Sequence, residues 1–130
     1  LIEAIAKEAQ EGMSELLPQN FTNIAWACAA LGIWNPSLFS AIANELLCKI
    51  AECNSQNLAS TAWAFATLKC FNAPLMAAIA AQATAIIGEF EPQELANIAW
   101  AFATLEVLDL PMMKAISNSA SYAGKFGSQE

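Results

Sequence analysis

An eleven-residue stretch that recurs three times constrains the fold of this chain more than any other feature. Its first copy runs from Phe21 to Leu31, and the later copies begin at Leu58 and Leu95. Successive copies lie 37 residues apart. A constant period of about 20–50 residues is typical of stacked repeat proteins, so the sequence predicts an array of similar units. Each copy carries a tryptophan at the same position, and these are Trp26, Trp63 and Trp100.

Each unit has the pattern of two helices joined by a short turn. The first helix opens at Pro18, Ser55 or Pro92, and proline suits a first helical turn because its missing N–H has no partner to lose. We expect the second helices over about 36–52, 73–88 and 110–123. The sequence therefore predicts an all-α fold, a right-handed α-solenoid of about seven helices built from 37-residue helix-turn-helix repeats. Residues of strong N-cap type precede the second helices, and these are Asn35, Asn72 and Asp109.

The repeat frame divides the chain into one solenoid and a short tail. We expect the solenoid to cover residues 1–123, with a half repeat over 1–17 and repeats over 18–54, 55–91 and 92–123. Residues 1–15 align with the second helices when 37 is added, so they are expected to form the second helix of an incomplete repeat. Further repeats upstream are left open. Residues 124–130 contain two glycines and are expected to form a flexible tail.

With 3.6 residues per turn, the first helix of each repeat presents three faces. A face of large apolar residues is expected to close the core of the repeat against the second helix. A face of alanines, including Ala62 and Ala66, is expected to form the seam between repeats, because small side chains let helices approach closely. The third face places uncharged polar residues beside the tryptophans, and its candidate contact residues are Gln19, Asn23, Gln56, Ser60, Thr67, Gln93, Asn97 and Thr104.

Two interpretations of the third face remain open. In the first, Trp26, Trp63 and Trp100 form a spine that sets the repeat spacing, and the neighbouring polar groups bond to backbone or to the indole N–H. In the second, the indole rings stack on nucleotide bases while amides and hydroxyls bond to base edges. The repeated stretch carries no charge, which favours burial. We therefore expect the tryptophans to be structural and the polar residues to contact a protein partner or RNA.

The segment from Pro92 to Leu105, with its counterparts from Pro18 and Ser55, carries the pattern (P)Q-x-L-A-N-x-A-W-A-x-A-x-L. This pattern closely resembles the octotricopeptide and heptatricopeptide repeats of organellar proteins from algae and protists, and less closely the helical repeats that precede RAP domains. The resemblance covers nearly the whole chain. It implies paired-helix solenoids that work in chloroplasts or mitochondria, usually by binding RNA. It also implies that the binding determinants lie on the first helices, at the amide, hydroxyl and tryptophan positions.

The charge of the chain departs from what an RNA-binding solenoid needs. The chain has five lysines, no arginine and a net charge of −7, and no two lysines share a position in the repeat frame. RNA affinity grows with the number of phosphates that basic residues neutralise, so affinity for the RNA backbone should be weak. Three glutamates instead form an acidic column at 37-residue intervals, namely Glu15, Glu52 and Glu89. This column is interpreted as a solvated turn, with a docking edge for a basic partner as the alternative.

No constellation of residues with catalytic chemistry is present in the sequence. Histidine is absent, and so are a phosphate-binding loop, a dinucleotide glycine pattern and HExxH, so we predict no catalytic residue, no cofactor and no metal site. The four cysteines form no CxxC pair and are expected to be reduced and structural, which fits a reducing compartment. The longest nearly apolar run, 73–88, is shorter than the roughly 20 residues that a membrane span needs, so no span is expected.

We therefore expect a non-catalytic interaction module, as a protein-binding or structural subunit of a larger organellar complex such as a plastid membrane complex or a ribosome. The hydrophobic share of 57% and the mean hydropathy of +0.42 favour a chain embedded among partners. The alternative is an octotricopeptide-type module that binds single-stranded RNA and acts in organellar RNA stability, processing or translation. The expected location is an organelle, the chloroplast in preference to the mitochondrion, with the chain soluble or peripherally associated.

Overall fold

The computed structural model describes residues 16–127, and for residues 120–127 it describes only the course of the helix. The predicted all-α fold is confirmed, and the packing of neighbouring helices is that of a helical-repeat solenoid. The expected helix over 1–15 lies outside the described residues, and the right-handed course of the stack stays a prediction. Within the described part the chain forms six α-helices, namely α2 (Pro18–Leu31), α3 (Pro36–Cys48), α4 (Ser55–Thr67), α5 (Ala73–Ala85), α6 (Pro92–Thr104) and α7 (Leu110–Gly127).

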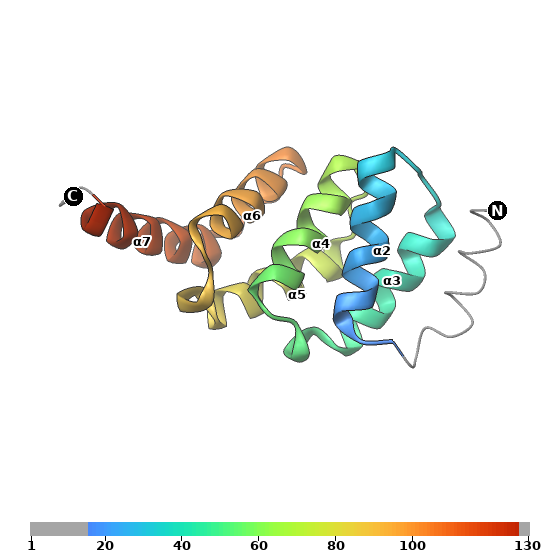
Figure 1. Ribbon diagram of the computed structural model, residues 1–130, viewed down its shortest axis with the longest axis horizontal. Coiled ribbons are helices and arrows are strands. Elements are labelled where there is room, and N and C mark those ends of the chain that lie inside the picture. Colours follow the sequence, from blue (N-terminus) through green and yellow to red (C-terminus); the bar gives the residue numbers. More distant parts are fainter. Residues whose placement is uncertain (1–15, 128–130) are drawn as a thin grey trace.

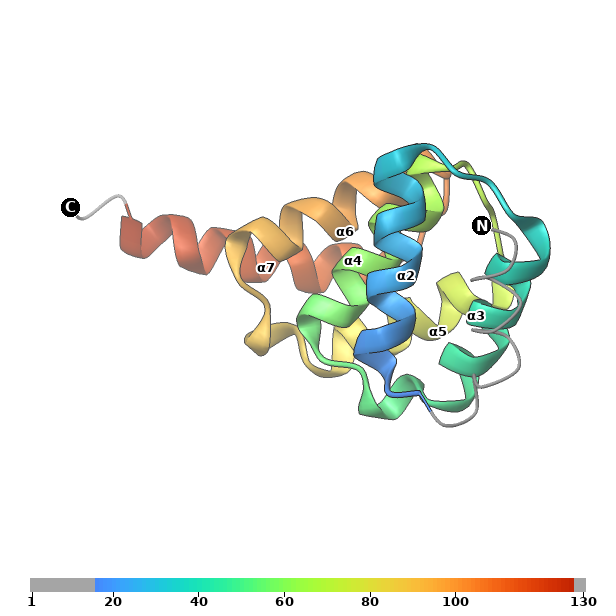
Figure 2. The ribbon, with the colours of Figure 1, turned by 45° about the vertical axis from the view of Figure 1, so that its right-hand side comes forward.

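The helices form two layers (Figure 1). The first helices of the repeats, α2, α4 and α6, pack side by side, and the most extensive contacts between helices of residues 16–127 join α4 to α2 and α6. The second helices, α3, α5 and α7, form the other layer, and each packs on the first helix of its own repeat. The turned view shows α2 and α3 at one end of the stack and α6 and α7 at the other (Figure 2). The first helices therefore present one continuous surface across three repeats.

The second helices begin at the capping residues that the sequence predicts. The side-chain oxygens of Asn35, Asn72 and Asp109 accept hydrogen bonds from the backbone N–H three residues later, at 3.0, 3.0 and 2.9 Å. Each bond satisfies an N–H at the helix start that has no partner within the helix. The three caps give the second helices the same starting point in every repeat.

The first helices also end alike, in a left-handed residue. Gly32, Lys69 and Glu106 have φ angles of 69°, 55° and 58°. The N–H of the following residue bonds to a carbonyl five positions earlier, at 2.8, 2.7 and 2.9 Å, which is the Schellman arrangement. Glycine adopts this conformation freely, whereas Lys69 and Glu106 adopt it at a cost of roughly 1 kcal/mol. The turn is therefore imposed by the surrounding packing and caps in the second and third repeats.

The core lies between the two layers. The rings of Phe21, Phe65 and Phe102 on the first helices are fully buried, as the predicted apolar face requires. Phe39 of α3 meets Phe65 edge-on, with ring centroids 5.0 Å apart and an interplanar angle of 62°. This arrangement is one that aromatic pairs favour.

The seam between first helices is built from small residues. Ala25 and Ala29 of α2 and Ala62 and Ala66 of α4 are buried where the predicted alanine face lies. Ser55 donates a hydrogen bond across the next seam to Glu94 of α6 at 2.9 Å, over 39 residues of sequence. In α6 the corresponding alanines are less covered, because no further first helix packs on that face within residues 16–127.

Three boundaries differ from the sequence expectation. The second helices of the first two repeats end at Cys48 and Ala85, and short 3-10 turns, η2 (Ile50–Glu52) and η3 (Ile87–Glu89), complete the expected ranges. Helix α7 continues through Gly127, so the expected flexible tail begins as helix, and residues 128–130 lie outside the described part. Gly124 and Gly127 lie within this helix, where a glycine lowers helix stability by about 1 kcal/mol relative to alanine. No helix in residues 16–127 is both long and apolar enough to cross a membrane.

Candidate interaction site on the first helices

A small polar pocket lies on the exposed surface of the first helices. Its volume is about 230 Å³, and three consecutive repeats contribute to it. This volume is below the range of pockets that enclose a cofactor or drug-sized ligand, and it matches a single planar group. The lining residues are Trp26 of α2, Ser60 and Trp63 of α4, and Gln93 and Asn97 of α6.

The aromatic wall of this pocket is a stacked pair. The rings of Trp26 and Trp63 have centroids 6.2 Å apart and an interplanar angle of 30°. Trp63 is partly buried, whereas Trp26 keeps 51% and Trp100 keeps 48% of its surface exposed. The stack links the first two repeats, but half of the Trp26 ring stays accessible to a partner. The role of the tryptophans as a spine stays a prediction.

The polar wall carries hydroxyl and amide groups without charge. Ser60 and Asn97 are half-buried, and Gln93 is exposed. Such groups both donate and accept hydrogen bonds, so they suit a neutral planar partner such as a peptide amide or a nucleobase edge. They offer little attraction to a phosphate group, which Lys and Arg bind.

The structure brings three of the eight predicted contact residues into this pocket, and the others lie elsewhere. Gln19, Asn23 and Gln56 are exposed on the same layer but do not line the pocket. Thr104 is exposed at the end of α6. The hydroxyl of Thr67 is buried, and it has no hydrogen-bond partner in the structure. The roles of all eight as partner contacts stay predictions.

The acidic column is exposed where the structure describes it. Glu52 and Glu89 lie in the 3-10 turns after α3 and α5, and Glu15 lies outside the described residues. These turns stand at the end of the repeat opposite to the turn between its two helices. Both the solvated-turn interpretation and a docking edge are compatible with this exposure.

The first helices thus carry a neutral polar pocket, half-exposed indoles and no basic track. The family model of the RNA-editing substrate-binding complex 6 protein matches residues 1–127 of the chain. The chain belongs to this family. No curated protein sequence matches it. The likeness to octotricopeptide and heptatricopeptide repeats is not confirmed by the comparison and remains a resemblance.

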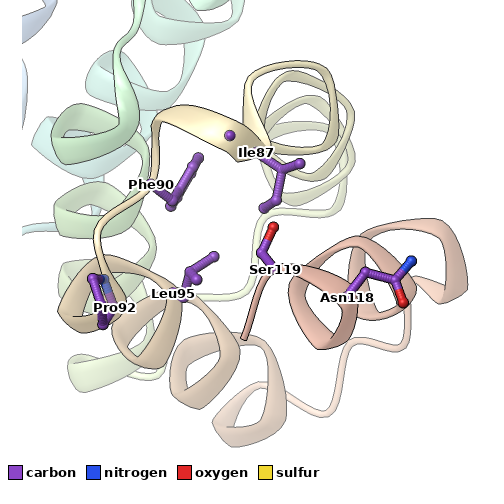
Figure 3. A pocket seen from close by; sticks show the side chains of 7 residues that line it. Ile87, Phe90, Pro92, Leu95, Asn118 and Ser119 are labelled. Carbon is purple, nitrogen blue, oxygen red and sulfur yellow. The ribbon is translucent and has the colours of Figure 1, made fainter. Parts of the chain in front are cut away.

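A second, larger pocket of this family member contains none of the eight predicted contact residues. Its volume is about 400 Å³, and it lies between η3, the start of α6 and the middle of α7. Ile87, Phe90 and Leu95 face it from one side, with Ser119 on the α7 side (Figure 3). Among the described residues, its lining side chains are apolar except for Asn118 and Ser119.

Three of the four thiols are partly or fully buried, and Cys48 is exposed. Burial raises the pKa of Cys28 and Cys70, and burial together with the charge of Glu52 raises the pKa of Cys53 to about 11. A raised pKa lowers the thiolate fraction at neutral pH and with it the reactivity. All four cysteines are free, and in the described part no group of three or more acidic or cysteine side chains could hold a metal ion.

One surface feature was missed by the sequence interpretation. Trp34, Phe71 and Leu108 are exposed, and they occupy the same position of the turn between the two helices of each repeat. Their spacing of 37 residues was available in the sequence. The three residues differ in type, so the shared position is less apparent than that of the tryptophans or of the capping residues.

Proposed function

We propose that the chain is a non-catalytic helical-repeat subunit that binds other protein subunits within an RNA-editing complex. The observation that carries the proposal is the family match, which covers residues 1–127 and whose family is named for a component of an RNA-editing complex. A stack of helices with an extended accessible surface is the architecture that solenoid proteins use to hold partners.

The charge supports protein partners over the RNA backbone. The chain carries a net charge of −7 with five basic residues, and among them Lys49 already pairs with Glu45 at 3.1 Å. A protein that neutralises few phosphates gains little from counterion release, which supplies most of the non-specific affinity for nucleic acid. Affinity for the complex would therefore come from apolar and neutral polar contacts.

This proposal is tested by purifying the chain, with an affinity tag, from cells that produce it. We expect other proteins of an RNA-editing complex to co-purify in fixed proportion at 0.3 M salt, where exposed charge pairs are largely screened (Debye length of about 6 Å). Recovery of the tagged chain alone, with RNA-editing complex proteins present in the same extract, would contradict the proposal.

A second candidate function is direct contact with unpaired bases, and the pocket between Trp63 and Asn97 favours it. A base stacked on the exposed Trp26 ring would place its edge near the amides of Gln93 and Asn97. Base–aromatic stacking contributes about 1–3 kcal/mol per base. Titration of single-stranded RNA across a salt series tests this candidate. Micromolar affinity that is lost in Asn97→Ala supports it, and absence of binding at 50 mM salt rules it out.

The proposed location follows from the family match and not from the octotricopeptide resemblance, which favoured the chloroplast. Membership in an RNA-editing complex family favours an organelle, and it gives no support to the chloroplast. We propose that the chain is located in an organelle, together with the RNA-editing complex to which it belongs. Fractionation of cells with an antibody to the chain tests this location, and recovery of the chain in the cytosolic fraction would contradict it.

A further inference from the structure

Three large apolar side chains stand exposed in a row along one edge of the solenoid. Trp34, Phe71 and Leu108 keep 50%, 59% and 73% of their surface accessible. Each belongs to the turn between the first and second helix of its repeat, and the intervals between them are 37 residues. Single exposed apolar residues are ordinary on a protein surface, but a contiguous set marks an interaction site. We call these three residues the turn ridge.

The turns that carry the ridge have one conformation in all three repeats. On one side the Schellman bond fixes the chain, and on the other side the N-cap of the second helix fixes it, with two residues between. In the second repeat the first of these two residues, Cys70, packs against the core, and the second, Phe71, is exposed. Because both flanks are capped, the ridge is preorganised, and a partner would not have to order it.

We propose that the turn ridge docks an amphipathic helix of another protein subunit, an inference that rests on the proposed role as a subunit of an RNA-editing complex. The apolar side chains of the docking helix would contact the ridge residues one by one, from Trp34 through Phe71 to Leu108.

The spacing of the ridge matches a helix. Packed helices lie about 8–10 Å apart, so equivalent turns of neighbouring repeats are separated by about this distance. Residues seven apart on an α-helix point to the same side and are separated by about 10.5 Å along its axis. An apolar residue at every seventh position of a partner helix would therefore meet one repeat after another, in the way that amphipathic helices present i and i+7 anchors.

The charged residues beside the turn ridge indicate which charges the docking helix carries. Lys69 lies two residues before Phe71, Glu106 and Asp109 lie on either side of Leu108, and Lys114 shares a pocket with Leu110. A complementary helix carries an acidic residue near its centre and basic residues near the end that meets Leu108. Two copies of this chain paired antiparallel through their ridges would centre on Phe71 and bring the two Lys69 side chains together, which is unfavourable. The charges thus favour a different protein over a second copy.

The exposed area is adequate for the centre of an interface. Leu31 and Leu110 widen the ridge at its two ends, and both are more than half exposed. Large aromatic and aliphatic side chains contribute on the order of 100 Å² each at this exposure, so the five residues offer on the order of 500 Å². A standard interface buries about 800 Å² per partner, with an apolar centre and a polar rim.

The proposal is tested in the native complex with a photo-cross-linking amino acid. It is placed at position 34, 71 or 108 in three versions of the tagged chain, and at exposed Leu17, on the other turn of the repeat, as the control. We expect all three ridge positions to cross-link to one segment of one other subunit, at sites about seven residues apart, and position 17 to miss that segment. Cross-links to a second copy of this chain, to RNA, or to no common segment would overturn the proposal.

Substitutions provide the second measurement. We expect Phe71→Ser with Leu108→Ser to reduce co-purification of the cross-linked subunit at least 10-fold, while the thermal midpoint stays that of the parent. Trp34 is left unchanged because its ring also contacts buried Phe39, with centroids 5.6 Å apart. The control Leu17→Ser removes an exposed apolar side chain on the other turn of the repeat and should co-purify normally. Normal co-purification of the ridge variant would overturn the docking ridge and leave the proposed function standing, whereas failure of the parent chain to co-purify would overturn both.

Discussion

The hydroxyl groups of Thr22 and Thr61 lie 3.2 Å apart in the buried seam between α2 and α4. Both residues are almost fully buried, and each hydroxyl is the other's partner. The pair marks the register of the first helices, because a residue of one repeat meets the residue 39 positions later in the next. The hydrogen bond from Ser55 to Glu94 repeats this offset at the seam between α4 and α6.

The threonine pair predicts a strong coupling between two substitutions. Thr22→Val or Thr61→Val alone leaves one buried hydroxyl without a partner and should lower the free energy of unfolding by about 1–3 kcal/mol. The double variant removes both polar groups and should be close to the parent. A double-mutant cycle by urea denaturation measures this coupling. Strictly additive losses would show that the two hydroxyls do not depend on each other.

Thr67 predicts a substitution that does not destabilise. Its buried hydroxyl has no hydrogen-bond partner, so Thr67→Val should leave the free energy of unfolding unchanged or raise it by about 1 kcal/mol. Thr84 is the matched control, because its hydroxyl donates to the Ala80 carbonyl at 2.8 Å. Thr84→Val should therefore be the less stable of the two variants in thermal denaturation, and the reverse order would contradict this account.

Alanine substitutions of Trp63 and Trp100 should lower the free energy of unfolding by unequal amounts. Trp63 is partly buried and stacks on Trp26, so Trp63→Ala should cost about 3–5 kcal/mol, as for other large aromatic truncations. Trp100 is half exposed, and Trp100→Ala should cost less than half as much. Unfolding followed by far-ultraviolet circular dichroism avoids dependence on the indole fluorescence. Equal losses would argue that Trp63 and Trp100 contribute alike to one structural spine, and a negligible loss at Trp63 would exclude the spine.

Cys53 predicts a loss of stability in alkaline solution. Its pKa is raised from 9.0 to about 11 in the folded chain by burial and by the charge of Glu52, so the folded state holds this proton more tightly than the unfolded state. The protonated Cys53 thiol therefore contributes to the free energy of unfolding below pH 9. This contribution is lost as the pH rises towards 11, with a loss of roughly 2 kcal/mol. Cys53→Ala should show a flatter pH profile than the parent.

Exposed Cys48 provides the control for this profile. Other groups titrate in the same range in every variant, so the difference between parent and Cys53→Ala isolates the buried thiol. If Cys48→Ala flattened the profile as much as Cys53→Ala, burial would not be the cause.

Much of the architecture could be predicted because repeated local signals agree. Asn35, Asn72 and Asp109 stand at one position of the frame, and each accepts the capping bond that its residue type suits. The alanine seam followed in the same way from helical geometry. The split of the second helices into an α-helix and a 3-10 turn was not predicted, because such ends depend on packing and not on a local residue signal.

The surface of the solenoid was less predictable than its core. The absence of charge around Trp26 and Trp100 suggested burial, yet both rings are half exposed because the side-by-side packing of α2, α4 and α6 leaves that side open. The pocket formed by Ser60, Asn97 and their neighbours depends on the offset between repeats, which no single repeat encodes. The turn ridge shares a position but not a residue type, so a search for identical residues passes over it.

The size of the native particle after nuclease treatment tests the central claim most directly. The tagged chain is purified from its organelle, treated with ribonuclease and analysed by size-exclusion chromatography with mass measurement. A protein-binding subunit is predicted to stay in a particle several times heavier than its own mass, together with other proteins of an RNA-editing complex. Collapse of that particle to the free chain on digestion of RNA would contradict the account and show that RNA holds the chain in the complex.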